Sequence, residues 1–256
     1  MTSSKRSEVA LVTGGSRGLG KSMALHLADR GVGVVVTYQS GAAAAGEVVK
    51  QIEGKGGKAA ALQLDVGDTR GFGAFAEALA SQLGATFGRD RFDYLVNNAG
   101  IGVHASFAET TEAQFDALVN IHLKGTFFLT QKLLPLIADG GSILNISTGL
   151  ARFTLPGYAA YAAMKGGVEV LTRYMAKELG PRKITVNVLA PGAIETDFGG
   201  GAVRDNPDLN RAIASQIALG RVGLPDDIGG AVALLLSPAG RWINGTRIEA
   251  SGGTLL

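Results

Sequence analysis

A glycine-rich turn separates an apolar run from an amphipathic stretch near the start of the chain. The apolar run at residues 9–13 predicts a β-strand, and a helical pattern covers residues 17–30 and ends at Gly31. Gly14, Gly18 and Gly20 lie between the two, where the chain must turn and the helix must pack closely on the strand. The N-terminus of such a helix offers free N–H groups and a positive dipole end to a pyrophosphate. The pattern predicts a dinucleotide-binding α/β fold, and an ordinary glycine turn is the alternative.

The same alternation continues along the chain. We expect further strands at residues 32–37, 59–64, 93–96, 142–147, 184–189 and 247–251, and helices at 42–54, 69–83, 111–137, 158–179 and from 225 onward. Near-continuous apolar strands separated by helices are typical of a parallel sheet covered on both faces. The prediction is therefore an α/β doubly wound parallel sheet, a Rossmann fold, with about seven strands.

Domain organisation follows from the absence of any linker or repeat in the sequence. Residues 1–256 are expected to form a single dinucleotide-binding catalytic domain. Residues 190–222 are the exception to the regular pattern, because they contain three successive glycines and predict only a short helix at 209–217. A long irregular stretch in a compact domain is usually functional or disordered, so we interpret this segment as a mobile substrate lid.

The composition excludes several classes of function. Charged residues are 18% of the chain and the net charge is +2, which gives no electrostatic argument for binding nucleic acid or a membrane. Without cysteine, the chain has no disulfide, thiolate nucleophile or cysteine metal site, and its three histidines are too scattered to predict a metal site. Residues 1–8 lack the apolar segment of a secretory signal, and no apolar run is long enough to span a bilayer. We expect a cytoplasmic protein.

Tyr161 and Lys165 are the strongest candidates for chemistry. They are four residues apart in a predicted helix, so their side chains share one face. A tyrosine with its ordinary pKa is a poor acid–base catalyst at neutral pH, and a neighbouring ammonium group favours the phenolate. The spacing thus predicts that Lys165 lowers the pKa of Tyr161 into the working range of a general acid and base.

The end of the second predicted strand bears on the choice of cofactor. An NAD site usually has an acidic residue there, about 20 residues after the glycine turn, to bind the ribose 2′-hydroxyl. Here the strand is followed by Tyr38, Gln39 and Ser40, and the first acidic residue is Glu47. Arg17 in the glycine turn is placed to pair with a 2′-phosphate. The sequence favours NADP(H), with NAD(H) as the alternative.

Asp65 and Val66 end the third predicted strand. We expect Asp65 to accept a hydrogen bond from the adenine amino group and Val66 to contact the ring. The alternative is that Asp65 is the N-cap of the next helix.

Taken in order, these motifs resemble those of the classical short-chain dehydrogenases/reductases. The resemblance covers residues 9–253 and rests on Thr13-Gly14-x3-Gly18-x-Gly20, Asp65-Val66, Asn97-Asn98-Ala99-Gly100, Asn120, Ser147-Thr148, Tyr161-x3-Lys165 and Pro191-Gly192. It implies an oxidoreductase that transfers a hydride between NADP(H) and a ketone, aldehyde or secondary alcohol. It also implies a homo-oligomer, a dimer or tetramer built on the two long helices and the C-terminal region.

The resemblance implies a role for each matching residue. Tyr161 would be the general acid in reduction and the base in oxidation, Lys165 would lower its pKa and hold the nicotinamide ribose, and Asn120 would hold a water in a proton relay. Together with the glycine turn, it places the cofactor against these residues: Gly14, Ser16, Arg17, Gly18, Leu19, Gly20, Tyr38, Gln39, Ser40, Asp65, Val66, Asn98, Ala99, Gly100, Ser147, Tyr161, Lys165, Pro191, Gly192, Ile194 and Thr196. No metal is expected.

One position departs from the family pattern. The family's catalytic serine lies 13 residues before the tyrosine, and here that residue is Thr148, with Ser147 just before it. Because side chains alternate along a strand, the two hydroxyl groups are expected to point in opposite directions. We predict that Thr148 is the fourth catalytic residue and keep Ser147 as the alternative.

The substrate is the least constrained feature. Phe153, Leu155, Tyr158 and Phe198 suggest an apolar pocket framed by residues 150–158 and 194–203, and His104 is expected at the surface. A 3-oxoacyl-[acyl-carrier-protein] reductase is an alternative, because Arg182 lies where that branch grips its acidic carrier. Its second basic position is missing in residues 139–141. A non-catalytic dinucleotide-binding regulator is the alternative from another class, and the intact catalytic set argues against it.

Overall fold

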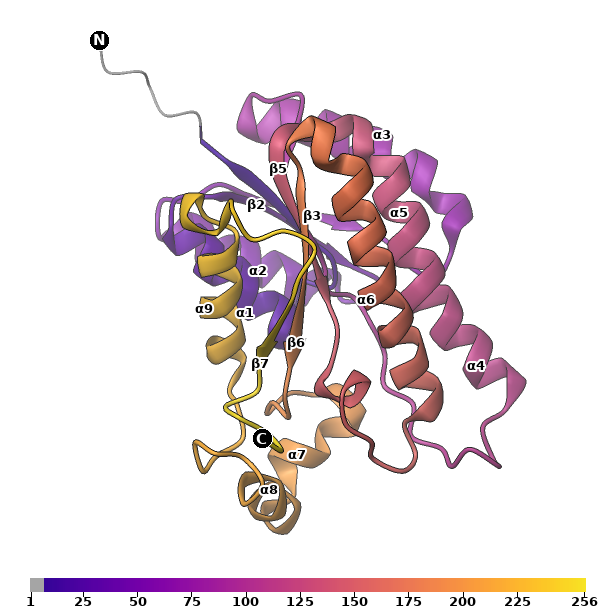
Figure 1. The fold of residues 1–256 in the computed structure, drawn as a ribbon. Coiled ribbons are helices and arrows are strands. Elements are labelled where there is room, and N and C mark those ends of the chain that lie inside the picture. The colour runs from indigo at the N-terminus through magenta and orange to yellow at the C-terminus, as the bar shows by residue number, and fades with distance from the viewer. Residues whose placement is uncertain (1–6) are drawn as a thin grey trace.

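The computed structural model describes residues 7–256, and residues 1–6, part of the segment where no secretory signal is expected, lie outside the described residues. Within residues 7–256 the chain forms a sheet of seven parallel strands in the order β3-β2-β1-β4-β5-β6-β7 (Figure 1). The strands are β1 (Val9–Val12), β2 (Gly33–Tyr38), β3 (Ala59–Gln63), β4 (Phe92–Asn97), β5 (Ile137–Ile146), β6 (Thr185–Pro191) and β7 (Arg247–Ala250). β1 and β4 are parallel neighbours, and the order in which successive strands are added to the sheet reverses between them, which confirms the predicted doubly wound Rossmann fold.

Two layers of helices cover the sheet. The helices are α1 (Gly18–Asp29), α2 (Ala42–Gly54), α3 (Phe72–Gln82), α4 (Glu112–Leu118), α5 (Gly125–Leu133), α6 (Ala159–Leu179), α7 (Ala202–Asp205), α8 (Pro207–Ala214) and α9 (Pro225–Leu235). In Figure 1 the helices α1, α2 and α9 lie on one face of the sheet and α3 to α6 on the other. None of the helices within residues 7–256 has the length and apolar content that crossing a lipid bilayer requires.

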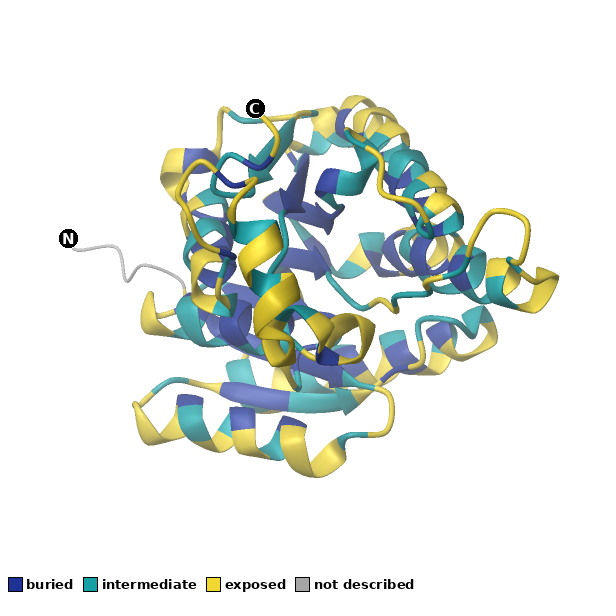
Figure 2. Ribbon diagram, turned by 90° about the horizontal axis from the view of Figure 1, so that it is seen from below, coloured by how far each residue is buried: buried dark blue, intermediate teal, exposed yellow. Residues whose placement is uncertain are grey.

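The core is divided by the sheet because strand side chains alternate between its faces. Ala10 and Val12 of β1 pack with α1, α2 and α9, whereas Val9 and Leu11 pack with α3, α5 and the end of α6. The strands β1, β2, β4 and β6 are almost fully buried, and most of the exposed residues lie on the outward sides of the helices and in the loops (Figure 2). This explains why the strands appear in the sequence as continuous apolar runs.

The long helix predicted at residues 111–137 is interrupted, which corrects that expectation. After α4 the chain forms a π-helical segment, Val119–Lys124, before α5, and it leaves the helix at a 3-10 turn, Leu134–Leu136. Pro135 lacks the N–H group that a continuing helix needs. Ile137 then already belongs to β5, five residues before the predicted strand start.

Residues 190–222 hold more helix than the sequence pattern indicated. The three glycines at 199–201 all have positive φ and form a turn that leads into α7, and Asn206 caps α8 by accepting hydrogen bonds from Asp208 N and Leu209 N. The sequence pattern predicts only a single helix at 209–217, whereas the structure has α7 and α8 before residue 215. In Figure 1 these two short helices lie beyond the lower end of the sheet, where the parallel strands end.

A chain of buried amide and hydroxyl groups ties the sheet to α6. Asn97 Nδ2 donates to Asn145 Oδ1 at 2.8 Å, and Asn145 Nδ2 donates to Thr172 Oγ1 at 2.8 Å. Buried polar groups are costly unless they are paired, so these bonds specify how α6 lies against β4 and β5. They fix the helix that carries Tyr161 and Lys165.

Candidate active site

The predicted site residues converge at the carboxyl end of the sheet. Gly14, Asn98, Thr148 and Gly192 follow β1, β4, β5 and β6 respectively. Since parallel strands all end at the same edge, these four segments surround one crevice. The N-terminal half of α6 brings Tyr161 and Lys165 to the same edge.

The glycine turn has the shape that a pyrophosphate needs. Gly14 has φ +65°, and a Cβ atom on Gly20 would lie 2.2 Å from Gly14 O, so a side chain at either position would strain the turn. Asn98 Nδ2 fastens the turn to β4 by donating to Thr13 O at 2.8 Å. Arg17, the N-cap of α1, makes no side-chain cap, which leaves the first N–H groups of the helix pointing into the crevice without a capping acceptor. The turn therefore fits a dinucleotide phosphate.

The 2′-phosphate end of the site is polar and exposed. Gln39 Nε2 donates to Asp65 Oδ2 at 2.9 Å, and Gly67 N donates to Asp65 Oδ1 at 2.8 Å. The alternative that Asp65 is a helix N-cap is wrong, because Asp68 caps the following turn by accepting from Arg70 N. Arg17 is 77% exposed and lies 3.9 Å from Asp197 of the segment after β6.

Tyr161 and Lys165 lie on one face of α6 and are both buried. Lys165 Nζ is 5.7 Å from the centre of the Tyr161 ring and donates to Ile146 O at 2.7 Å. Burial lowers the pKa of Lys165 to about 8. Burial also raises the pKa of Tyr161 above its ordinary value, and a hydrogen bond with Thr148 opposes this shift only in part.

The predicted lowering of the Tyr161 pKa is therefore not what the structure gives. The helical spacing correctly placed the two side chains together, but it carries no information about how deeply the phenol is buried. Desolvation disfavours the phenolate more than the other groups around Tyr161 favour it. The phenol is held in its protonated form at neutral pH.

The two hydroxyl residues at the end of β5 have different surroundings. Ser147 is buried, and its Oγ donates to Glu169 Oε1 of α6 at 2.7 Å. Thr148 is partly exposed, its Oγ1 accepts from Leu150 N at 3.3 Å, and its hydroxyl group contacts the Tyr161 phenol. The two side chains thus have separate partners, as the alternation along a strand leads one to expect.

Asn120 lies in the π-helical segment between α4 and α5. The wider turn places the Asn120 carbonyl as the acceptor of Gly125 N. Single π-turns are frequent at functional sites because they displace a side chain or carbonyl from the regular helical position. The sequence identified Asn120 only through the family resemblance and did not indicate the π-turn.

His122, in the same segment, was not assigned a role from the sequence. Its ring is buried, lies edge-on to Tyr161 with 5.3 Å between ring centres, and contacts Ile101 O through Nε2 at 2.8 Å. Its Nδ1 is buried without a hydrogen-bond partner among the described residues. Burial and the nearby Lys165 charge lower the pKa of His122 to about 3, so the ring is neutral.

The remaining predicted cofactor contacts also lie around the crevice. Gly192 N donates to Ala250 O of β7, and Ile194 pairs with Gly223 across the segment after β6. The Thr196 side chain lies against the glycine turn, 3.7 Å from where a Cβ of Gly18 would be. The other residues of the set come from the same loops and strand ends: Ser16, Leu19, Tyr38, Ser40, Val66, Ala99, Gly100 and Pro191.

Aromatic rings lie around Tyr161. The ring centre of Phe198 is 5.6 Å from that of Tyr161, and the centre of Tyr158 is 6.5 Å away. His104 is exposed as expected, but its ring stacks edge-on against Tyr158 at 5.0 Å. Leu155 is 55% exposed and has no such contact. Two rings thus lie beside the phenol, and the His104 ring extends this aromatic group through Tyr158.

Arg182 is engaged in a structural role, which weakens the acyl-carrier alternative further. Its guanidinium donates to Asp139 Oδ1 and Leu134 O, both at 2.8 Å, and to Ile137 O at 2.5 Å. It lies just before β6, at the amino end of the sheet and away from the crevice. Its guanidinium N–H groups are already used in hydrogen bonds within the fold.

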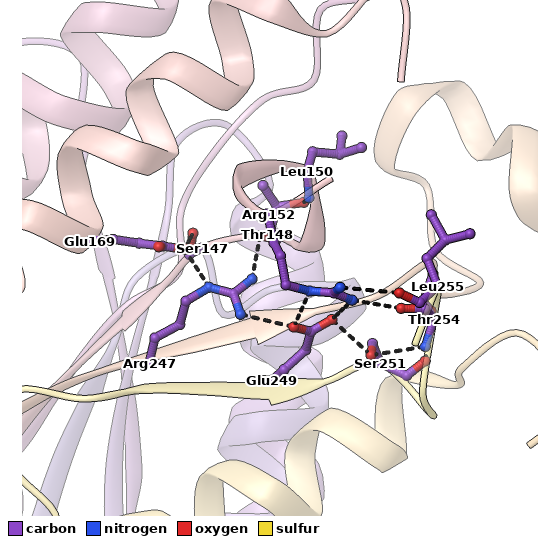
Figure 3. A network of polar contacts seen from close by, with 10 residues as sticks. All are labelled: Ser147, Thr148, Leu150, Arg152, Glu169, Arg247, Glu249, Ser251, Thr254 and Leu255. Atoms are coloured by element: carbon purple, nitrogen blue, oxygen red, sulfur yellow. Dashed lines mark hydrogen bonds and ion pairs between the residues drawn. The ribbon is translucent and has the colours of Figure 1, made fainter. Parts of the chain in front are cut away.

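A network of charged residues beside Thr148 was missed by the sequence analysis. Glu169 of α6 and Glu249 of β7 both bind Arg247, and Glu249 also binds Arg152 (Figure 3). Burial raises the pKa of Glu249, but hydrogen bonds from Arg152, Arg247 and Ser251 outweigh it and lower the pKa to about 2. The available signal was the four-residue spacing of Tyr161, Lys165 and Glu169, which puts all three on one helical face.

Comparison with known proteins adds the family context. Residues 14–254 match the family model described as enoyl-(acyl carrier protein) reductase. The chain is 35% identical to the tetrahydroxynaphthalene reductase PfmaG of Pestalotiopsis fici over 257 residues, which cover 96% of this chain and 91% of that protein.

Two solved structures share the fold over nearly their whole length. The promiscuous reductase LugOII, which catalyses keto-reduction at C1 during lugdunomycin biosynthesis, superimposes with a TM-score of 0.93 at 39% identity, covering 99% of this chain and 100% of that one. The angucycline C-6 ketoreductase LanV with bound NADP gives a TM-score of 0.92 at 38% identity, covering 97% and 95%. The similarity in fold therefore extends over nearly the whole chain.

Proposed function

This chain belongs to the short-chain dehydrogenase/reductase family, and both solved structures compared above are of ketoreductases, so we propose that it is an NADPH-dependent ketoreductase in which Tyr161 is the general acid. The observation that carries the proposal is the buried Tyr161 phenol in contact with the Thr148 hydroxyl and 5.7 Å from Lys165, at the carboxyl end of the sheet. A proton donor, a second hydroxyl and a cation together suit the reduction of a C=O group.

The chain's own residues supply the proton and the hydrogen bonds. The Thr148 hydroxyl donates to the carbonyl oxygen, and the Tyr161 phenol transfers its proton to the same oxygen as negative charge develops there. When bound, NADPH supplies the hydride that attacks the carbonyl carbon. Because burial keeps the phenol protonated, the site is prepared for reduction more than for oxidation. The buried ammonium of Lys165 stabilises the tyrosinate that remains.

The cofactor preference follows from the charges near the end of β2. Gln39 and Ser40 leave no carboxylate directly after the strand, and Arg17 offers an exposed guanidinium. LanV binds NADP, and its similarity to this chain supports the same preference. The Asp65 carboxylate lies beside Gln39 and accepts a hydrogen bond from Gln39 Nε2.

We propose a flat aromatic or fused-ring ketone as the substrate. Phe198 and Tyr158 place two rings next to the catalytic phenol, His104 adds a third ring beside Tyr158, and such rings bind planar groups by stacking. Relatives named as reductases of tetrahydroxynaphthalene and of an angucycline support this class. An aliphatic ketone would leave these rings without a stacking partner.

The test is a ketone panel with matched cofactors. NADPH consumption should be fastest with fused-ring ketones, and NADPH should bind at least about tenfold more tightly than NADH, as a charge-assisted contact with Arg17 implies. Binding should be followed by nicotinamide fluorescence. The only tryptophan, Trp242, precedes β7 at the amino end of the sheet, opposite to the cofactor site, and is too distant to report on the cofactor.

Tyr161→Phe should lower turnover by about 10²- to 10⁴-fold and leave NADPH affinity within twofold. Unchanged turnover in that variant would refute the mechanism.

A further inference from the structure

Three consecutive residues at the end of β5 are each fastened to charged groups. Lys165 Nζ donates to Ile146 O at 2.7 Å, Ser147 Oγ donates to Glu169 Oε1 at 2.7 Å, and Arg247 donates to Thr148 O at 3.2 Å. Lys165 and Glu169 lie four residues apart on the same face of α6 as Tyr161. The segment that ends in Thr148 is therefore held against the helix that carries the phenol.

Arg247 joins the three elements that meet here. Figure 3 shows its guanidinium between Glu169 of α6, Glu249 of β7 and the Thr148 carbonyl. Its Nε donates to Glu169 Oε1 at 2.8 Å, and its Nη1 donates to Glu249 Oε2 at 2.9 Å. Three contacts thus come from one planar group, whose fixed geometry sets the positions of its partners relative to one another.

The arrangement is balanced in charge and largely shielded from water. The Arg247 side chain is 23% exposed and that of Glu169 15%. Glu249 also accepts a hydrogen bond from Arg152, so positive and negative side chains alternate along the network. Arg152 in turn donates to the carbonyl groups of Thr254 and Leu255 near the C-terminus. Removing one partner of a shielded pair leaves the other charge uncompensated, so the partners of Arg247 would move if it were lost.

We propose that Arg247 is a positioning residue, which holds Thr148 at the angle and distance from Tyr161 that reduction requires. The inference rests on the proposed function, because it takes Thr148 and Tyr161 as the two groups that contact the substrate carbonyl. Within residues 7–256 the Arg247 guanidinium donates to the Thr148 carbonyl and to two carboxylates, so it acts through Thr148. A small rotation at Thr148 moves its hydroxyl away from the carbonyl oxygen without disturbing the glycine turn.

We call Arg247 with its three acceptors, Glu169, Glu249 and the Thr148 carbonyl, the clamp. Its loss should have a different effect from the loss of a purely structural ion pair. Misplacement of a reacting group by about 1 Å costs about 10²-fold in rate, while binding of the cofactor at a distant subsite is unaffected. Arg247→Met should therefore lower kcat by about 10- to 100-fold and leave the Kd for NADPH within about twofold. Arg247→Lys keeps the charge but cannot reach all three acceptors at once, so it should recover part of the lost kcat.

Arg182 provides the matched control. Like Arg247, it is a half-buried arginine that binds three acceptors. In its case these are one carboxylate and two backbone carbonyls, and they lie at the amino end of the sheet. Arg182→Met should lower the melting temperature about as much as Arg247→Met and leave kcat unchanged. If both variants lose kcat in proportion to their loss of stability, or if Arg247→Met keeps the wild-type kcat, the positioning role is refuted.

Hydrogen–deuterium exchange separates this inference from the proposed function, because it needs no turnover. In Arg247→Met, peptides covering residues 147–153 should exchange faster, since Leu150 N donates to Thr148 Oγ1, whereas Arg182→Met should leave those peptides unchanged. Faster exchange with a wild-type protein that reduces no ketone would support the clamp and refute the proposed function. Identical exchange in wild type and Arg247→Met would refute the clamp, whatever the activity.

Discussion

Ser147 and Thr148 show how one strand position decides the role of a hydroxyl group. Ser147 Oγ is committed to Glu169, whereas the Thr148 hydroxyl faces Tyr161. A buried hydrogen bond to a carboxylate is not easily exchanged for a bond to a substrate. The two residues should therefore respond differently to substitution, although both are small and carry the same functional group.

We expect Thr148→Val to lower kcat by about 10²-fold, because it removes a donor to the developing oxyanion and keeps the shape of the side chain. Thr148→Ser should retain activity within a few-fold, and Ser147→Ala should cost less than Thr148→Val. Steady-state kinetics on one fused-ring ketone at saturating NADPH would compare the three. A larger loss in Ser147→Ala than in Thr148→Val would assign the catalytic hydroxyl to Ser147.

His122 makes the stability of the fold depend on pH. Its pKa is lowered from 6.5 to about 3 by burial, so at pH values between these two the unfolded chain binds a proton that the folded chain refuses. The unfolded state then binds more protons, and the free energy of unfolding falls as the pH falls. The slope from one such group is at most about 1.4 kcal/mol per pH unit.

His122→Gln should remove this component. Urea unfolding at a series of pH values from about 6.5 down to about 4 would show a steeper loss of stability for wild type than for the variant. Subtraction of the two curves cancels the contribution of the carboxylates, which both proteins share. Parallel curves would mean that His122 titrates normally in the folded protein.

At the scale of elements, the helices and strands were predictable where local pattern decides them. The alternation of apolar runs gave the seven strands, and the helix after β1 begins within one residue of its predicted start. The π-turn at Asn120 was not predictable, because it follows from how α4 and α5 pack on the sheet and not from any residue preference. The network around Arg247 was hidden for a related reason, since the residues that it joins are up to 99 residues apart in sequence.

The contact between α1 and the segment after β6 provides an element-scale prediction. Arg17, at the start of α1, lies 3.9 Å from Asp197, which also binds Arg204 of α7. A 2′-phosphate that pairs with Arg17 must compete with this carboxylate. We therefore expect Asp197→Asn to tighten NADPH binding by about two- to threefold and to leave NADH binding unchanged.

Arg17→Met should have the opposite effect, weakening NADPH binding by about tenfold and NADH binding by less than twofold. Nicotinamide fluorescence titrations of both cofactors would measure this. Arg91→Met is the control, because Arg91 is an exposed arginine just before β4, at the amino end of the sheet and so opposite to the cofactor site. Equal losses for NADPH and NADH in Arg17→Met would show that Arg17 does not read the 2′-phosphate.

At the scale of the whole molecule, large apolar side chains are exposed at several places on the described part of the chain. One apolar surface lies on the outer helices, where Phe127 and Phe128 of α5 are each 42% exposed and Val170 and Tyr174 of α6 are 45% and 66% exposed. A second includes Trp242, which is 99% exposed just before β7. Apolar patches of this kind usually mark interfaces between proteins, and the commonest such interface joins two copies of one chain. The sequence alone could not separate these positions from core positions, because the same apolar spacing serves both.

We predict a homo-oligomer with the α5–α6 surface at one interface. The wild type should have a mass of two or four chains by light scattering, and the double variant Val170→Glu, Tyr174→Glu should halve it, because two charges per copy would be buried at a symmetric contact. Phe107→Glu is the control, since Phe107 is an exposed aromatic residue in the loop after β4, outside both surfaces, and should leave the mass unchanged. Trp242→Glu then distinguishes the two assemblies, because it should reduce a tetramer to a dimer but leave a dimer formed through α5 and α6 intact. A monomeric wild type at micromolar concentration would contradict the prediction and leave both surfaces free for a different partner.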